Sequence, residues 1–116
     1  DAGEFPARRE PITPREDFRH ARALPDAALS VYYSEWQRRA VMSRAGRVLT
    51  LSADDPLDHF ILHAPHAQPY FCLEPISHVA DAINLAAQGW EGTGLRALAP
   101  GETLLMRMQL RIGTTA

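Results

Sequence analysis

The chain has 116 residues, of which 46% are hydrophobic and 22% charged, so its composition is that of an ordinary globular protein and its length allows one domain at most. Its 12 basic and 14 acidic residues leave a net charge of −2, which gives no basic footprint for nucleic acid. The sequence contains no run of about 18 apolar residues, so we expect no membrane span.

The cysteine content and the N-terminal residues bear on the compartment. The single cysteine, Cys72, can form no internal disulfide and is compatible with a reducing environment. Residues 1–10 are polar and lack the apolar core of a signal peptide. We therefore expect a cytoplasmic protein.

The first half of the chain predicts loops followed by strands. Residues 1–17 are expected to be mostly loop, because their prolines interrupt any continuous helix or strand. Residues 29–36 are rich in aromatic and β-branched side chains, which predict a strand. Two β-prone runs, 38–43 and 47–52, flank a glycine-containing turn and predict a hairpin.

Residues 58–64 predict a buried-type strand, and this strand contains two of the four histidines that suggest a metal centre. Together with one carboxylate they are His59, His63, His66, His78 and Glu74. Imidazole is the commonest transition-metal ligand, but these histidines contain no His-x-His pair, and Pro65 separates His66 from the strand. We predict surface or hydrogen-bonded structural roles for them, with no metal site and no cofactor.

The most informative stretch is an apolar, strand-like run that reaches a carboxylate, Glu74, just before Pro75. The residue before a proline is pushed towards extended geometry, and proline cannot donate to a sheet ladder. We therefore expect Glu74 to sit at the end of a strand and to point beyond the sheet. A carboxylate in such a place is a candidate general base.

The last third of the chain predicts a short helical segment and a long strand. Residues 81–87 could form one or two helical turns, and the glycines that follow do not fit a dinucleotide-binding fingerprint. Residues 103–112 predict a strand with one apolar face and a second face dominated by polar residues, and we interpret the methionines as core filler. The residues expected on the apolar face of that strand are Leu104, Met106, Met108, Leu110 and Ile112. About seven short strands result, so we predict an all-β, antiparallel β-sandwich.

The run Phe71-Cys72-Leu73-Glu74-Pro75, followed by Ser77-His78 and then Asp81-Ala82-Ile83-Asn84, resembles the C-terminal catalytic segment of aldose 1-epimerases (galactose mutarotases). The resemblance is specific over 69–84, because it is an ordered string of unlike residue types, and it is weak over the rest of 18–112. It implies the C-terminal part of a large antiparallel β-supersandwich. The implied activity is interconversion of the α and β anomers of an aldohexose, without a cofactor.

The resemblance also implies roles for single residues. It assigns the general base to Glu74. Many family members carry a Leu-Asp-His-Cys-Tyr-Thr-Gly-Trp stretch whose Asp binds sugar hydroxyls, and alignment on Leu29, Tyr33 and Trp36 puts Ser30 at the Asp position. Ser30 carries no charge, which is a departure from the family. We take Ser30, Tyr33 and Trp36 as candidate sugar-binding residues, although core packing is the role that we favour for the two rings.

The general-acid histidine of the family lies upstream and matches no position in this chain. The family's proteins are also considerably longer, and this chain starts at Asp1 without an initiator methionine. We therefore expect a C-terminal fragment whose isomerase activity requires an upstream segment. The expected ligand is a small-molecule sugar, and the chain could form a homo-oligomer or pair with that segment. The alternative is a non-catalytic carbohydrate-binding or sandwich-completing module.

Overall fold

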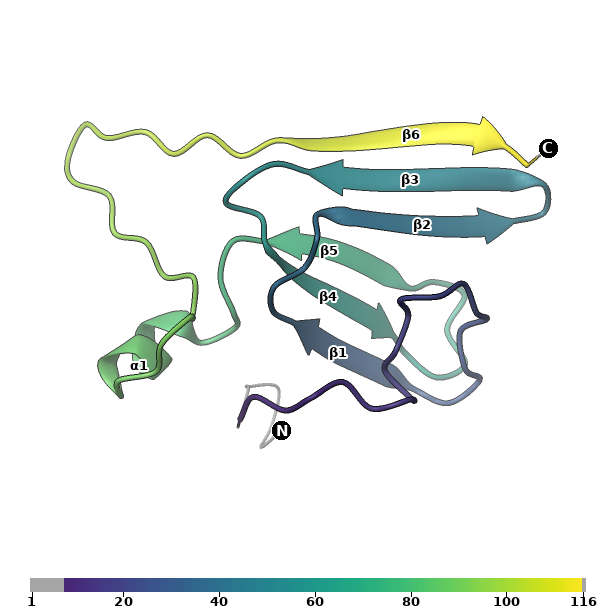
Figure 1. Ribbon diagram of the computed structural model, residues 1–116, viewed down its shortest axis with the longest axis horizontal. Helices are drawn as coiled ribbons and strands as arrows, with labels where there is room; N and C mark the ends of the chain where they lie inside the picture. Colours follow the sequence, from purple (N-terminus) through teal and green to yellow (C-terminus); the bar gives the residue numbers. More distant parts are fainter. Residues whose placement is uncertain (1–7, 116) are drawn as a thin grey trace.

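The computed structural model describes residues 8–115, so the loop expected over residues 1–7 lies outside them. Within the described part, six strands and one short helix follow one another along the chain (Figure 1). They are β1 (Leu29–Tyr33), β2 (Arg39–Arg44), β3 (Arg47–Ala53), β4 (His59–Ala64), β5 (Cys72–Ile76), α1 (Ala82–Ala87) and β6 (Met108–Thr114). The all-β prediction is confirmed, with six described strands where about seven were expected.

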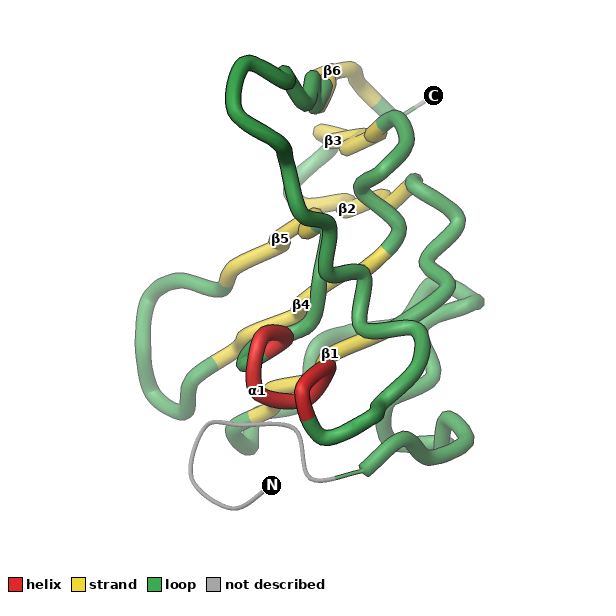
Figure 2. Tube along the Cα trace, turned by 90° about the vertical axis from the view of Figure 1, so that its left-hand side faces the viewer, coloured by secondary structure: helices red, strands yellow, loops and turns green. Residues whose placement is uncertain are grey.

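The strands form two antiparallel three-stranded sheets. The first sheet has the order β1-β4-β5, and the second has the order β2-β3-β6 (Figure 1). The predicted hairpin is the β2–β3 pair, which turns through Ala45 and Gly46, both with positive φ. Figures 1 and 2 show helix α1 beyond the end of the first sheet at which β1 finishes. This helix confirms the helical turns predicted for residues 81–87.

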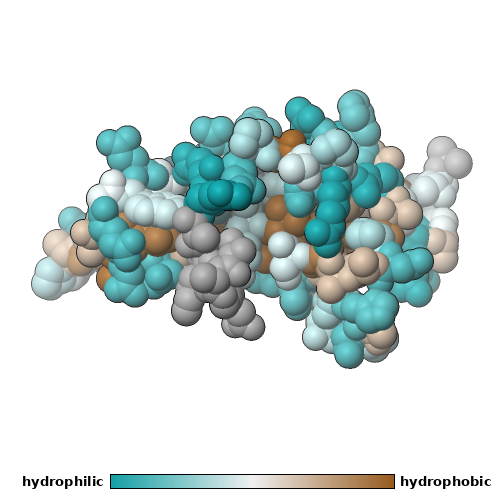
Figure 3. Space-filling view, turned by 90° about the horizontal axis from the view of Figure 1, so that it is seen from below, coloured by the Kyte–Doolittle hydropathy of each residue, from teal (hydrophilic) through white to brown (hydrophobic). Residues whose placement is uncertain are grey.

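The core lies where the second sheet meets the apolar face of the first. Its buried residues are Leu29, Leu51, Phe60, Leu62 and Ala64. Four of them come from β1 and β4, and Leu51 comes from β3. Much of the remaining surface is hydrophilic on the side seen in Figure 3, with hydrophobic side chains visible in patches.

The start of β6 and the exposure of its apolar side chains both differ from the sequence prediction. The strand begins at Met108 rather than at residue 103, and it pairs along its whole length with β3. Its apolar side chains are not buried: Met108, Leu110 and Ile112 are all exposed, Ile112 to 70%. The interpretation of the methionines as core filler is therefore wrong, because the described chain places nothing over this part of the sheet.

The position of Glu74 is a second correction. The strand does not end at Glu74 but continues through Pro75 to Ile76, which pairs with His59. Strand β5 is at the edge of its sheet. A proline is tolerated in an edge strand, because only one side of the strand has to form hydrogen bonds with a neighbouring strand. Glu74 therefore projects from the middle of a strand rather than from its end.

Candidate functional site

The register of the first sheet decides which side chains lie together, because successive residues of a strand point to opposite faces. One face, called the polar face below, carries Ser30 and Tyr32 of β1, His59, Ile61 and His63 of β4, and Cys72, Glu74 and Ile76 of β5. The opposite face carries the apolar core. The structure thus brings Ser30 and Glu74 to one face and places Tyr33 on the other.

Glu74 is half-buried on the polar face, in the same cross-strand row as Ile61 and Tyr32. Within residues 8–115, no hydrogen bond or ion pair engages its carboxylate. The neighbours of Glu74 on β5 are held by pairing with β4, so the backbone that carries the carboxylate is fixed. A carboxylate of this kind can accept a proton from a bound ligand.

Ser30 and His63 form the next row of the polar face, which ends at Cys72. The hydroxyl oxygen of Ser30 and Nδ1 of His63 are hydrogen-bonded at 2.5 Å. His63 is half-buried, and its Nε2 has no partner within the described residues. Because directly opposite and diagonal side chains on a sheet face interact, His63 is a neighbour of Glu74.

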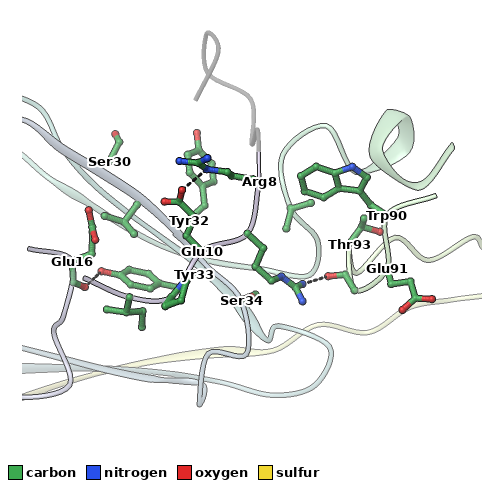
Figure 4. A pocket seen from close by; sticks show the side chains of 16 residues that line it. Arg8, Glu10, Glu16, Ser30, Tyr32, Tyr33, Ser34, Trp90, Glu91 and Thr93 are labelled. Carbon is green, nitrogen blue, oxygen red and sulfur yellow. Dashed lines mark hydrogen bonds and ion pairs between the residues drawn. The ribbon is translucent and has the colours of Figure 1, made fainter. Parts of the chain in front are cut away.

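A cavity of about 360 Å³ lies along β1, between this strand, the segment that begins at Arg8 and the loop that follows α1 (Figure 4). Ser30 and Tyr32 line it, so it is continuous with the polar face. Figure 4 shows Trp90 and Thr93 on the side away from Ser30. The lining therefore combines hydroxyl groups with three aromatic rings, those of Tyr32, Tyr33 and Trp90, which suits a polar ligand that also has apolar surface.

Both arginines that line this cavity have partners within the protein. Arg8 forms an ion pair with Glu10, which lies beside it in Figure 4. Arg9 donates from Nη2 to the carbonyl oxygen of Gly92 at 3.1 Å. The second contact ties the N-terminal segment to the loop after α1, and so joins two walls of the cavity.

The loop that forms the far wall is fixed against the end of the first sheet. The N–H of Val79 donates to the carbonyl oxygen of Thr93 at 2.9 Å. Gly94 has φ +76°, and a Cβ atom at this position would lie 2.2 Å from the carbonyl oxygen of Ser77. His59 is buried beneath the same loop, with Nδ1 2.8 Å from an Asp58 carboxylate oxygen. Only glycine fits at residue 94, so the close approach depends on it.

Tyr33 and Trp36 pack with the core instead of joining Glu74. The ring of Trp36 stacks on Phe60 with centroids 4.6 Å apart, and Tyr33 lies 6.4 Å from the same ring. The hydroxyl of Tyr33 donates to the carbonyl oxygen of Glu16 at 2.6 Å. Burial, with a smaller contribution from the nearby carboxylate of Glu16, raises the pKa of Tyr33 to about 12. The favoured core role of both rings agrees with this packing; their binding of sugar stays a prediction, and Tyr33 also lines the cavity.

The histidines have separate partners in the structure. His66 lies 2.9 Å from the carbonyl oxygen of Asp26 through Nδ1, and His78 lies 2.9 Å from the hydroxyl of Ser77. Within residues 8–115, no three His, Cys, Asp or Glu side chains are grouped so as to hold a metal ion. The same part of the chain contains no helix that is long and apolar enough to cross a membrane.

Three residues of the site were not singled out from the sequence: His63 as a neighbour of Glu74, and Trp90 and Thr93 in the cavity wall. For His63 a signal existed, because alternation along the strand expected over residues 58–64 puts residues 59, 61 and 63 on one face. For Trp90 and Thr93 the sequence offered only a glycine-rich loop. The loop that carries them is held through Thr93 and Gly94, which contact the segment from Ser77 to Val79.

Comparison with known proteins gives a weak relationship to one bacterial protein. No protein-family model matches the chain, and no solved structure matches it significantly. The uncharacterized protein YphB of Escherichia coli (strain K12) is 29% identical over 120 residues, which cover 96% of this chain and 39% of YphB. The chain thus spans about two fifths of the length of that relative.

Proposed function

We propose that this chain is part of an aldose 1-epimerase-like isomerase that interconverts the α and β anomers of an aldohexose, with Glu74 as the general base. In this reaction the base removes the proton of the anomeric hydroxyl while an acid protonates the ring oxygen. The ring opens, the C1–C2 bond rotates, and the ring closes in either configuration. Two titratable groups near the sugar are the minimum requirement.

The observation that carries the proposal is the free carboxylate of Glu74 on a polar sheet face. The residues around it, from Phe71 to Asn84, are those that resemble the catalytic segment of the epimerases. Its face continues into the cavity at Tyr32 and Ser30, where hydroxyl groups can contact a sugar. Carbohydrate has both hydroxyl groups and apolar faces, and Trp90 supplies an aromatic wall for the latter.

We also propose that the two sheets are the C-terminal part of the larger antiparallel sandwich of that family. Leu51 of the second sheet reaches into the core of the first, as expected for two packed sheets. The bare apolar row of β6 is what part of a larger sandwich would present. A cytoplasmic location and a small-molecule sugar as ligand belong to the same proposal.

One observation favours a second function, a carbohydrate-binding module without turnover. Ser30 stands where the resemblance places a sugar-binding carboxylate, and it is bonded to His63. A neutral hydroxyl binds fewer hydroxyl groups than a carboxylate does. The cavity would then hold the sugar between Tyr32 and Trp90 without chemistry at Glu74.

Polarimetry of freshly dissolved α-D-glucose and α-D-galactose distinguishes these functions. The resemblance places the acid upstream of this chain, but His63 lies beside Glu74 on the same face, so we expect the chain alone to accelerate interconversion above the buffer rate. We expect Glu74→Gln to abolish the acceleration, because a neutral amide cannot accept the proton. Glu35→Gln is the matched control, since Glu35 is an exposed acid outside the cavity. An acceleration that survives in Glu74→Gln contradicts the proposal. Sugar binding without acceleration, equal in both variants, would favour the binding module.

A further inference from the structure

We infer that His63, held by Ser30, is the general acid of this site. The inference rests on the proposed function, but it concerns a residue to which the epimerase resemblance gives no role. The resemblance locates an acid upstream of this chain, whereas the structure places an imidazole on the same face as the base. His63 and Glu74 are diagonal neighbours on β4 and β5, a spacing on the order of 7 Å between Cα atoms. A pyranose ring lying on this face can therefore contact both.

The hydrogen bond to Ser30 determines which nitrogen faces the ligand. Because Nδ1 of His63 is bonded to the Ser30 hydroxyl, Nε2 is left as the atom that can carry a proton to substrate. Within the described residues this nitrogen has no partner. Ser30 stands where the resemblance places a sugar-binding Asp. In this chain its hydroxyl instead positions the imidazole of His63.

The proton balance closes with these two groups. Glu74 takes the proton of the C1 hydroxyl as His63 gives its Nε2 proton to the ring oxygen, and the C1–O5 bond breaks to leave the open-chain aldehyde. Ring closure reverses both transfers after the C1–C2 bond has rotated, so neither residue is consumed. Imidazole suits the acid role because its charge changes between pH 5 and 8.

The charged and titratable surroundings of His63 are simple. Those on its own face are Tyr32 of β1, His59 of β4, and Cys72 and Glu74 of β5. Strands β1, β4 and β5 contain no arginine or lysine. At the cavity edge beside Ser30, Arg8 and Glu10 are paired with each other. Glu74 is thus the carboxylate that strands β1, β4 and β5 bring to this face, diagonally next to His63.

The test compares His63→Gln with His66→Gln, a matched control whose imidazole contacts the Asp26 carbonyl oxygen on another part of the surface. General-acid catalysis contributes about 10²- to 10⁴-fold, so we expect His63→Gln to lower kcat by at least about 100-fold with little change in KM. The variant should also lose the part of the pH–rate profile between pH 5 and 8 that reports the imidazole. His66→Gln should keep both.

Ser30 is a positioning residue, and two variants separate its role from simple packing. We expect Ser30→Ala to lower kcat about 10-fold while the pH dependence due to imidazole remains, because the acid is present but less well oriented. Ser30→Thr keeps the hydroxyl and should restore most of the rate. Equal rates in Ser30→Ala and the parent chain would contradict the positioning role.

A second measurement keeps the inference testable if the chain shows no turnover. The imidazole resonance of His63, assigned by its loss in His63→Gln, is followed by NMR during titration with 1,5-anhydro-D-glucitol, a sugar analogue that has no anomeric hydroxyl. We expect the His63 resonance to shift and the His66 resonance to stay. A shift without turnover supports His63 as a sugar contact but overturns the isomerase proposal. Turnover that needs Glu74 but not His63, or a titration without a His63 shift, overturns this inference alone.

Discussion

The two sheets of this protein are built from the same alternating pattern but use it differently. In the first sheet, one face is covered by the core and the other is polar and carries the candidate site. In the second sheet, one apolar row runs from Leu51, which is 4% exposed, to Ile112, which is 70% exposed. Alternation therefore tells which residues share a face, whereas burial depends on what packs against that face.

Truncating one apolar residue in each sheet would test this contrast. The truncation in the first sheet should give the largest loss of unfolding free energy among our predictions. Phe60→Ala removes a buried ring that contacts Tyr33 and Trp36, so we expect a loss of about 3–5 kcal/mol in the free energy of unfolding. Ile112→Ala removes an exposed side chain and should change it by no more than about 0.5 kcal/mol. Urea unfolding measures both, and similar losses would show that the row on β6 is covered in solution.

A smaller effect is expected where the loop after α1 approaches the first sheet. Gly94→Ala places a Cβ against the Ser77 carbonyl and forces a side chain into positive φ, so we expect a loss of about 1–3 kcal/mol in unfolding free energy. Gly101→Ala is the matched control, because Gly101 also has positive φ but has open space around it. Equal losses in the two variants would mean that the contact with Ser77 contributes nothing.

The smallest predicted effect is a pH dependence of the unfolding free energy caused by Tyr33. This residue lies on the core face of the first sheet, opposite the polar face. The pKa of Tyr33 is raised from its ordinary value of 10.0 to about 12, so folding favours its neutral form. The resulting stabilisation is complete below pH 10 and is lost as the pH rises towards 12. Unfolding measured from pH 9 to 11.5 should therefore show a falling free energy that is shallower in Tyr33→Phe.

The same variant has an effect at neutral pH. Tyr33→Phe also loses the hydrogen bond to the Glu16 carbonyl, worth about 1 kcal/mol. Tyr70→Phe, at an exposed tyrosine, is the control and should leave the pH dependence as it is in the parent chain. An identical slope in Tyr33→Phe and the parent chain would contradict the assigned pKa.

Local sequence signals were enough for most of the strands. The hairpin was evident from two β-prone runs around Gly46. Strand β4, residues 59–64, was evident from a short apolar run that ends at a proline. The start of β6 was not evident, because alternation begins at residue 103 whereas pairing begins where Met108 meets Ala53, near the end of β3. A strand extends only as far as its partner does, and the partner is a distant segment.

Only part of the candidate site could be predicted from the sequence, because its geometry also depends on which strands pair. The motif around Glu74 identified the carboxylate, but its place in mid-strand follows from β5 being an edge strand, which local sequence does not show. The contact between Ser30 and His63 depends on the register of β1 against β4. A shift of one residue would have placed His63 among the core residues.

The edge position of β6 also has a consequence for amide hydrogen exchange. In residues 8–115 this strand has a neighbour on one side alone, β3. Successive N–H groups of an antiparallel strand point alternately to its two sides, so every second amide between residues 108 and 114 faces away from β3. Deuterium uptake along β6 should therefore alternate between slow and fast. Uniformly slow uptake would reveal that another strand has joined this edge, whichever chain supplies it.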